Sequence, residues 1–69
     1  MNANEAFDTH LRSLPIDEYR KMSKEIRKTF VISSTVFANW CSGRTRIPPF
    51  YRREINRILG KDIFSEVVD

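Results

Sequence analysis

The spacing of the apolar residues constrains this fold most, because these residues recur every three or four positions and nowhere alternate with polar ones. One such set follows Pro15 and contains Ile16, Tyr19, Met22, Ile26 and Phe30. Steps of three and four place side chains on one face of an α-helix, whereas a half-buried strand requires a period of two. The sequence therefore predicts an all-α fold, a compact bundle of four to five helices without a sheet.

A first helix is predicted before Pro15, where apolar residues are spaced i, i+4 and i+7. These residues are Phe7, Leu11 and Leu14. Asn2 or Asn4 would cap the start of this helix, because a short polar side chain can accept a hydrogen bond from an amide of the first turn.

A short third helix, about Ser34 to Ser42, is predicted between an N-cap at Ser33 and a C-cap at Gly43. The prolines at 48 and 49 would then open a last helix near its first position, and the glycine at 60 would end it. The residues expected to pack back on the core as a tail are Ile63, Phe64 and Val67.

The length of 69 residues allows one small domain and leaves little room for a catalytic cleft beside a core. The single cysteine, Cys41, excludes an internal disulfide and a thiol-only zinc site, and the lone His10 excludes a pair of histidine ligands. No glycine-rich phosphate loop, nucleophile–base pair or carboxylate pair with metal spacing occurs. We therefore expect no enzymatic activity, no cofactor, no metal and no small-molecule substrate.

No apolar run approaches the roughly 20 residues that span a bilayer. The first ten residues contain acidic side chains and lack the basic-then-apolar order of a signal peptide. A cytoplasmic location without a membrane partner is the expectation.

The net charge of +3 is distributed unevenly along the chain. Residues 20–61 carry eleven basic and two acidic side chains, a net charge of +9, whereas residues 1–19 and 62–69 each carry −3. A basic middle between acidic ends indicates a polyanion as partner. A solvated surface rich in lysine and arginine explains the charge alone equally well.

The predicted third helix has one apolar, aromatic face and one face that is small, neutral and able to form hydrogen bonds. The second face carries Ser34, Thr35, Ala38, Asn39 and Ser42. Small polar side chains allow a helix backbone to approach the DNA major groove, where base edges present donors, acceptors and thymine methyl groups. A helix that happens to have such a face, or one that packs on a partner protein, is the alternative.

Basic residues flank this helix on both sides in the sequence. Arg44 and Arg46 follow it directly, and Lys24, Arg27 and Lys28 lie in the helix before it. Contacts to phosphates position a protein on DNA without specifying the sequence. Basic side chains on either side of a neutral helix suit that role.

The apolar spacing of residues 26–40 matches a helix-turn-helix motif, in the pattern Ile26-x-x-x-Phe30-x-Ile32-x-x-x-x-Phe37-x-x-Trp40. The continuation WCSGRTRIP, residues 40–48, resembles the W-x-x-G-x-x-x-P ending of lambda-repressor-like DNA-binding domains, the Cro and phage repressor type. The resemblance covers about residues 16–64 and places a motif core at about 23–48 within one domain, 1–69.

The resemblance implies sequence-specific binding of double-stranded DNA by a small, repressor-like transcriptional regulator with helix 34–42 in the major groove. Many such domains bind as two-fold dimers, so a homodimer is one alternative. The residues expected on base edges are Ser34, Thr35, Ala38 and Asn39. The residues expected on phosphates are Ser23, Lys24, Lys28, Ser42, Arg44 and Arg46.

A protein-interaction module, such as an adaptor or anti-repressor, is the alternative function. It would lay the same helical surface on a partner protein and would not bind DNA. The short chain favours this alternative, because 69 residues leave no room for a separate effector domain.

Two residues depart from the pattern of the family. Arg27 stands where a small residue is usual, and Val31 stands where glycine usually opens the turn. Because a β-branched residue avoids positive φ, we expect a looser or longer turn. We also expect Arg27 to point outward and the two helices to meet at a wider angle.

Four further side-chain interpretations follow from position. Trp40 is expected to anchor the core, and Cys41 beside it is expected to be a small buried hydrophobe. Phe50 lies off the main stripe of the last helix and would be a dimer contact. A basic stripe on that helix would be a second phosphate track or a solvated face: Arg53, Arg57 and Lys61.

Overall fold

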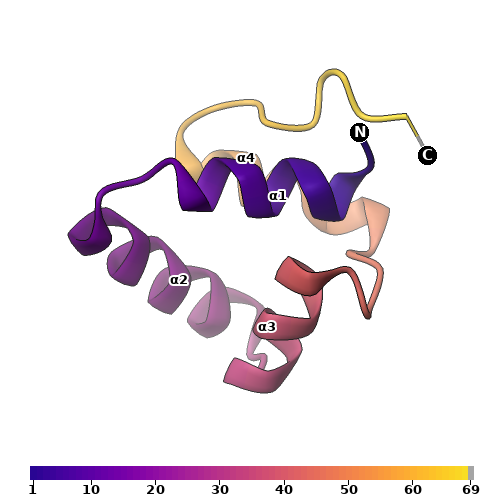
Figure 1. Ribbon diagram of the computed structural model, residues 1–69. Helices are drawn as coiled ribbons and strands as arrows, with labels where there is room; N and C mark the ends of the chain where they lie inside the picture. The colour runs from indigo at the N-terminus through magenta and orange to yellow at the C-terminus, as the bar shows by residue number, and fades with distance from the viewer. Residues whose placement is uncertain (69) are drawn as a thin grey trace.

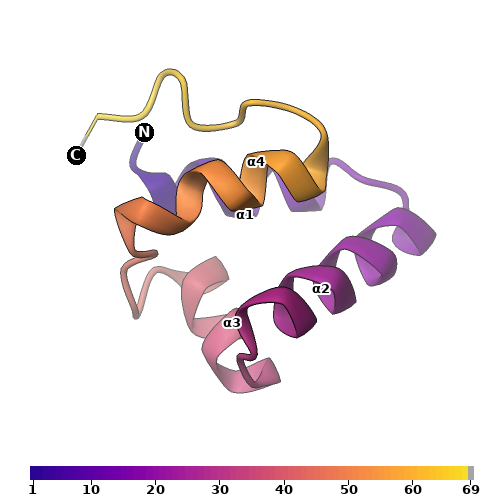
Figure 2. The ribbon, with the colours of Figure 1, turned by 180° about the vertical axis from the view of Figure 1, so that it is seen from behind.

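The computed structural model describes residues 1–68, which form four α-helices and one short 3-10 helix without a strand. The elements are α1 (Ala3–Arg12), α2 (Ile16–Phe30), α3 (Ser34–Ser42), η1 (Pro49–Tyr51) and α4 (Arg52–Leu59). α1 and α4 lie on one side of the molecule, and α2 and α3 lie on the other (Figure 1, Figure 2). The predicted all-α bundle is confirmed.

The start of α1 is fixed by a reciprocal pair of hydrogen bonds, a capping box. The Asn2 side chain accepts a hydrogen bond from the Glu5 amide at 2.9 Å, and the Glu5 carboxylate accepts one from the Asn2 amide at 3.1 Å. Of the two predicted caps, Asn2 is therefore the one that the chain uses. Asn4 is buried inside α1 and serves another purpose, described below.

The core forms where the apolar stripes of the four helices meet. Phe7 is completely buried, and its ring lies edge-on to Phe37 and Trp40, with centroids 5.7 and 6.2 Å away. Edge-to-face pairs of this kind add about 0.5–1.5 kcal/mol to the gain from burial. Trp40 is only 2% exposed, which confirms it as the anchor of the core.

The predicted opening of the last helix by two prolines is only partly right. Pro49 begins η1, and α4 begins three residues later at Arg52. Proline fixes φ in the range that a first helical turn requires, and here that turn is tightened into a 3-10 helix. The Tyr51 ring of η1 stacks on Phe30 of α2, with centroids 4.5 Å apart.

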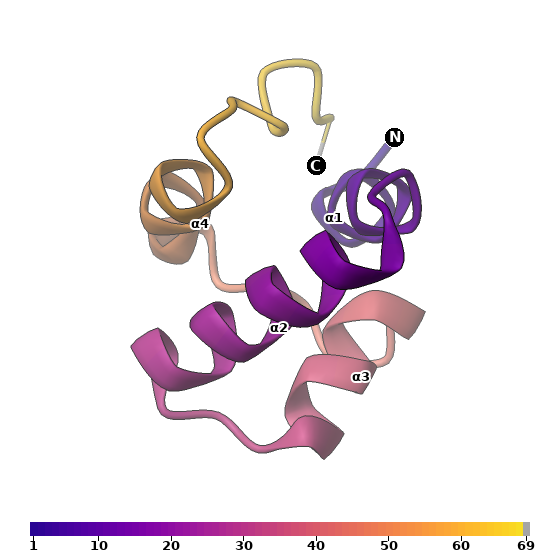
Figure 3. The same cartoon turned by 90° about the vertical axis from the view of Figure 1, so that its left-hand side faces the viewer.

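The C-terminal segment packs back on the molecule, as predicted. Gly60 ends α4 in the left-handed conformation, Phe64 is buried, and Ile63 and Val67 are half-buried. The Val68 amide donates a hydrogen bond of 3.0 Å to the Met1 carbonyl. Figure 3 shows this segment running from the end of α4 toward the start of α1.

None of the helices in residues 1–68 combines the length and the apolar character that crossing a membrane requires. The longest, α2, has 15 residues and is rich in charged side chains.

Candidate nucleic-acid interface

A tight turn of three residues joins α2 to α3. The first of them, Val31, caps α2 in the left-handed conformation, with φ 53° and ψ 50°. The Ile32 amide donates a hydrogen bond of 3.0 Å to the Arg27 carbonyl, which closes the last turn of α2. The predicted looser turn is therefore wrong. Because the Val31 side chain is 89% exposed, the expected cost is the intrinsic strain of this conformation, about 1–2 kcal/mol.

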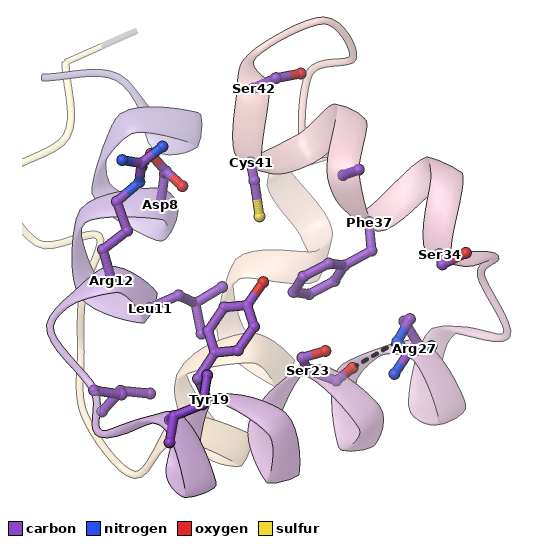
Figure 4. A pocket seen from close by; sticks show the side chains of 13 residues that line it. Asp8, Leu11, Arg12, Tyr19, Ser23, Arg27, Ser34, Phe37, Cys41 and Ser42 are labelled. Atoms are coloured by element: carbon purple, nitrogen blue, oxygen red, sulfur yellow. Dashed lines mark hydrogen bonds and ion pairs between the residues drawn. The ribbon is translucent and has the colours of Figure 1, made fainter.

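The prediction that the Arg27 side chain points outward is wrong. Its Nε donates a hydrogen bond of 3.3 Å to the Ser23 carbonyl, one turn earlier in α2. The guanidinium lies between α2 and the start of α3, on the side of Ser34 (Figure 4). α3 packs more extensively on α1 than on α2. A long side chain thus occupies the place where a small one would allow the two helices to approach closely.

The two ends of α3 form as the sequence predicts. The Ser33 hydroxyl accepts a hydrogen bond of 3.2 Å from the Val36 amide, and Gly43 ends the helix with φ 83°. Between these caps, Phe37 and Trp40 are buried in the core. The helix is therefore held rigidly, with its other face turned away from the core.

The neutral face of α3 is largely exposed. Ser34, Thr35, Ala38 and Ser42 are exposed, and Asn39 is partly exposed. Within residues 1–68 the polar side-chain atoms of Ser34, Thr35 and Asn39 form no hydrogen bond, whereas the Ser42 hydroxyl donates to the Asn39 carbonyl at 3.3 Å. Three of the four residues predicted on base edges thus present unengaged donors or acceptors, and Ala38 presents a methyl group.

Exposed basic side chains precede and follow α3 in the chain. Lys24 and Lys28 on α2 are exposed, and so are Arg44 and Arg46 in the loop after α3. The loop is tied to α3 by a hydrogen bond of 3.3 Å from the Thr45 amide to the Asn39 carbonyl. The loop that carries the two arginines is thereby fixed against the end of α3.

Ser23, also predicted on phosphates, is buried. It is 8% exposed and lines the groove between α2 and α3.

The basic stripe on α4 is partly engaged within its own helix. Arg57 forms an ion pair and hydrogen bonds with Glu54, one turn earlier. This hydrogen bond lowers the pKa of the Glu54 carboxyl, and the same bond raises the pKa of Arg57. Arg53 and Lys61 are exposed. Phe50, the predicted dimer contact, is 77% exposed at the start of this region.

A groove of about 770 Å³ between α1, α2 and α3 was not predicted from the sequence. Leu11 and Phe37 form its floor, and the side chains of Tyr19 and Cys41 project into it (Figure 4). The sequence carries one signal for this groove. A second line of residues on α2 starts with the first two residues of the core stripe, Ile16 and Tyr19. It then diverges through Ser23 and Arg27, with the spacing i, i+3, i+7 and i+11.

Cys41 lies at the border between this groove and the core, and it is half-buried where a buried side chain was expected. Burial raises the pKa of its thiol to about 11, and the negative charge of Asp8 acts in the same direction, against the opposing effect of Arg12. The thiol is therefore protonated at neutral pH and behaves as a weakly polar wall of the groove.

Residues 1–68 contain no group of three histidine, cysteine or acidic side chains that could hold a metal ion. Comparison of the chain with models of known protein families gives no match. Comparisons with curated proteins and with solved structures also give no match. The geometry of α3 and its surroundings is therefore the basis for any functional assignment.

Proposed function

We propose that this protein binds double-stranded DNA with sequence preference, by placing α3 in the major groove, and that it regulates transcription. The observation that carries the proposal is the exposed neutral face of α3, whose hydrogen-bonding groups are largely unengaged. Exposed cationic side chains precede and follow this helix in the chain. The three-residue connection between α2 and α3 has the length typical of a helix-turn-helix.

Each residue of the neutral face suits a particular part of a base pair. The Asn39 amide can donate to and accept from an adenine edge, and the Ala38 methyl can contact a thymine methyl. Ser34 and Thr35 can serve either a base edge or a phosphate, because a hydroxyl both donates and accepts. These contacts would supply the sequence preference.

The flanking cations would supply most of the affinity. Lys24, Lys28, Arg44 and Arg46 lie on both sides of α3 in the chain, and the Ser42 hydroxyl lies at the end of the helix. Neutralisation of phosphates by such groups releases counterions, which makes binding depend steeply on salt. Ser23 takes no part, because its side chain is buried.

Selection of bound duplexes from a random pool tests the proposal directly. We expect enrichment of a defined sequence, and half-site symmetry in that sequence would report a dimer. With about five phosphates neutralised, the logarithm of the binding constant should fall against the logarithm of salt with a slope near −4.5. A pool that stays random, with binding indifferent to salt, would contradict the proposal.

Such a negative result would favour the alternative, a protein-interaction module that does not bind DNA. Chemical-shift mapping separates the two functions at low salt, where non-specific binding to DNA is strongest. Shifts of the Ser34–Ser42 amides on addition of random duplex support DNA binding, and silence of the whole spectrum supports the module.

A further inference from the structure

The groove beside α3 has an apolar floor that the proposed DNA contacts do not use. Leu11 and Phe37 lie at its floor, and Leu14, Tyr19 and Cys41 form its half-buried walls. Ile16, at the end of the groove nearest α1, is 61% exposed although it is apolar. Phosphate and sugar groups gain nothing from such a floor, so DNA on α3 would leave this surface uncovered.

One uncompensated positive charge lies on the rim of the groove. Arg27 lines it, and in residues 1–68 its terminal guanidinium nitrogens have no carboxylate partner, since its one hydrogen bond uses Nε. The one acidic residue in the lining, Asp8, is already paired with Arg12 at 2.9 Å. An occupant with carboxylates would therefore complement this rim.

The dimensions of the groove fit a short helix. At a rise of about 1.5 Å per residue, the α2 wall from Ile16 to Arg27 is about 16 Å long, or three helical turns. Helix-in-groove recognition places apolar anchors spaced i, i+3 or i+4 and i+7 into a groove of this kind. A helix of two to three turns offers about three such anchors on one face.

We propose that this groove binds a short acidic amphipathic helix of a partner protein. The apolar face of that helix packs on Leu11 and Phe37, and one of its carboxylates pairs with Arg27. Ser34, Ala38 and Ser42 belong both to the groove wall and to the neutral face of α3. Occupancy of the groove therefore excludes DNA from α3. This exclusion, unlike the docking itself, rests on the proposed function.

Selection from a displayed library of random peptides about 16 residues long, panned on the full chain, tests the docking site. We expect enriched peptides to carry apolar residues at helical spacing together with Asp or Glu. The selected peptide should bind Arg27→Gln about tenfold more weakly, the loss of a charge-assisted contact. It should bind Arg53→Gln, which removes an exposed charge outside the groove, as tightly as the parent.

A second measurement does not depend on any variant folding correctly. In the parent protein, the selected peptide should shift the amide resonances of Tyr19, Phe37 and Cys41. Enrichment of nothing, enrichment of peptides without acidic residues, or shifts confined to other residues would each overturn the docking site.

Competition separates this inference from the proposed function. Displacement of bound duplex by the peptide supports both the docking site and the exclusion of DNA from α3. A ternary complex of peptide, protein and duplex overturns the exclusion. If the peptide binds in the groove and no duplex binds at any salt concentration, the proposed function fails, the exclusion falls with it, and the docking site stands.

Discussion

Asn4 on α1 and Trp40 on α3 are joined by a hydrogen bond of 2.8 Å, which the side-chain Nδ2 of Asn4 donates to the Trp40 carbonyl. The same Nδ2 donates a second bond of 2.8 Å to the carbonyl of Thr45. The last carbonyls of a helix have no partner within it, so a buried donor at this place satisfies a group that would otherwise be orphaned. One side chain thus fixes both the end of α3 and the loop that carries Arg44.

Substitution Asn4→Ala should lower the free energy of unfolding by about 1–3 kcal/mol, because it leaves a buried carbonyl of Trp40 without a donor. Asn4→Asp should be at least as damaging, since a carboxylate cannot donate. Urea denaturation measures both effects. Asn2→Ala provides the comparison: it removes only the cap of α1 and should lower stability by about 1 kcal/mol. A smaller loss for Asn4→Ala than for Asn2→Ala would contradict this role.

The role of Asn4 shows where sequence reasoning reached its limit. Capping chemistry is local, so residues 2 and 4 both qualified as caps, and the sequence offered no means of choosing between them. The partners of Asn4 lie 36 and 41 positions away, and only the packing of α1 on α3 brings them together. The helices themselves were predictable because apolar periodicity and glycine caps act within one turn.

The turn at Val31 was predicted incorrectly for a related reason. Positive φ at a β-branched residue is unfavourable by only about 1–2 kcal/mol. The favourable interactions of the rest of the fold can offset this free energy, as they do at Val31. Full exposure of the side chain removes any further clash. The groove was missed because its lining comes from three helices, α1, α2 and α3, that only the tertiary packing brings together.

Substitution Val31→Gly should stabilise the protein by about 0.5–1 kcal/mol. Relief of the left-handed strain gains about 1–2 kcal/mol, and the greater freedom of glycine in the unfolded chain offsets part of it. Thermal denaturation followed by circular dichroism measures the change. Gly43→Ala is the opposite case and should lower stability, because φ at this position is 83°. An added Cβ would meet nothing within 4 Å, so the loss of stability measures the conformational strain alone. A lower melting temperature for Val31→Gly would refute the assignment of strain.

The Cys41 thiol should make stability depend on pH in the alkaline range. Its pKa rises from about 9 in the unfolded chain to about 11 in the fold, because burial disfavours the thiolate. The unfolded state therefore loses its proton first, so this contribution is complete below pH 9 and is lost as the pH rises toward 11. Urea midpoints across this range, compared with those of Cys41→Ala, isolate the effect from other titrating groups. Parallel curves for the two proteins would contradict it.

The proposed DNA contacts differ in what their removal should change. Asn39→Ala should cost about 1–3 kcal/mol on the selected sequence and relax the preference at one base pair, because a bidentate contact to adenine is lost. Lys28→Ala should weaken binding to all duplexes alike and reduce the salt slope by about 1, because it removes a charge and no base contact. Fluorescence anisotropy with the selected duplex, a single-base variant and a scrambled duplex measures all three quantities. If Asn39→Ala weakens binding to all three duplexes equally, Asn39 contacts a phosphate and not a base edge. If Lys28→Ala leaves the salt slope unchanged, Lys28 does not contact the DNA backbone.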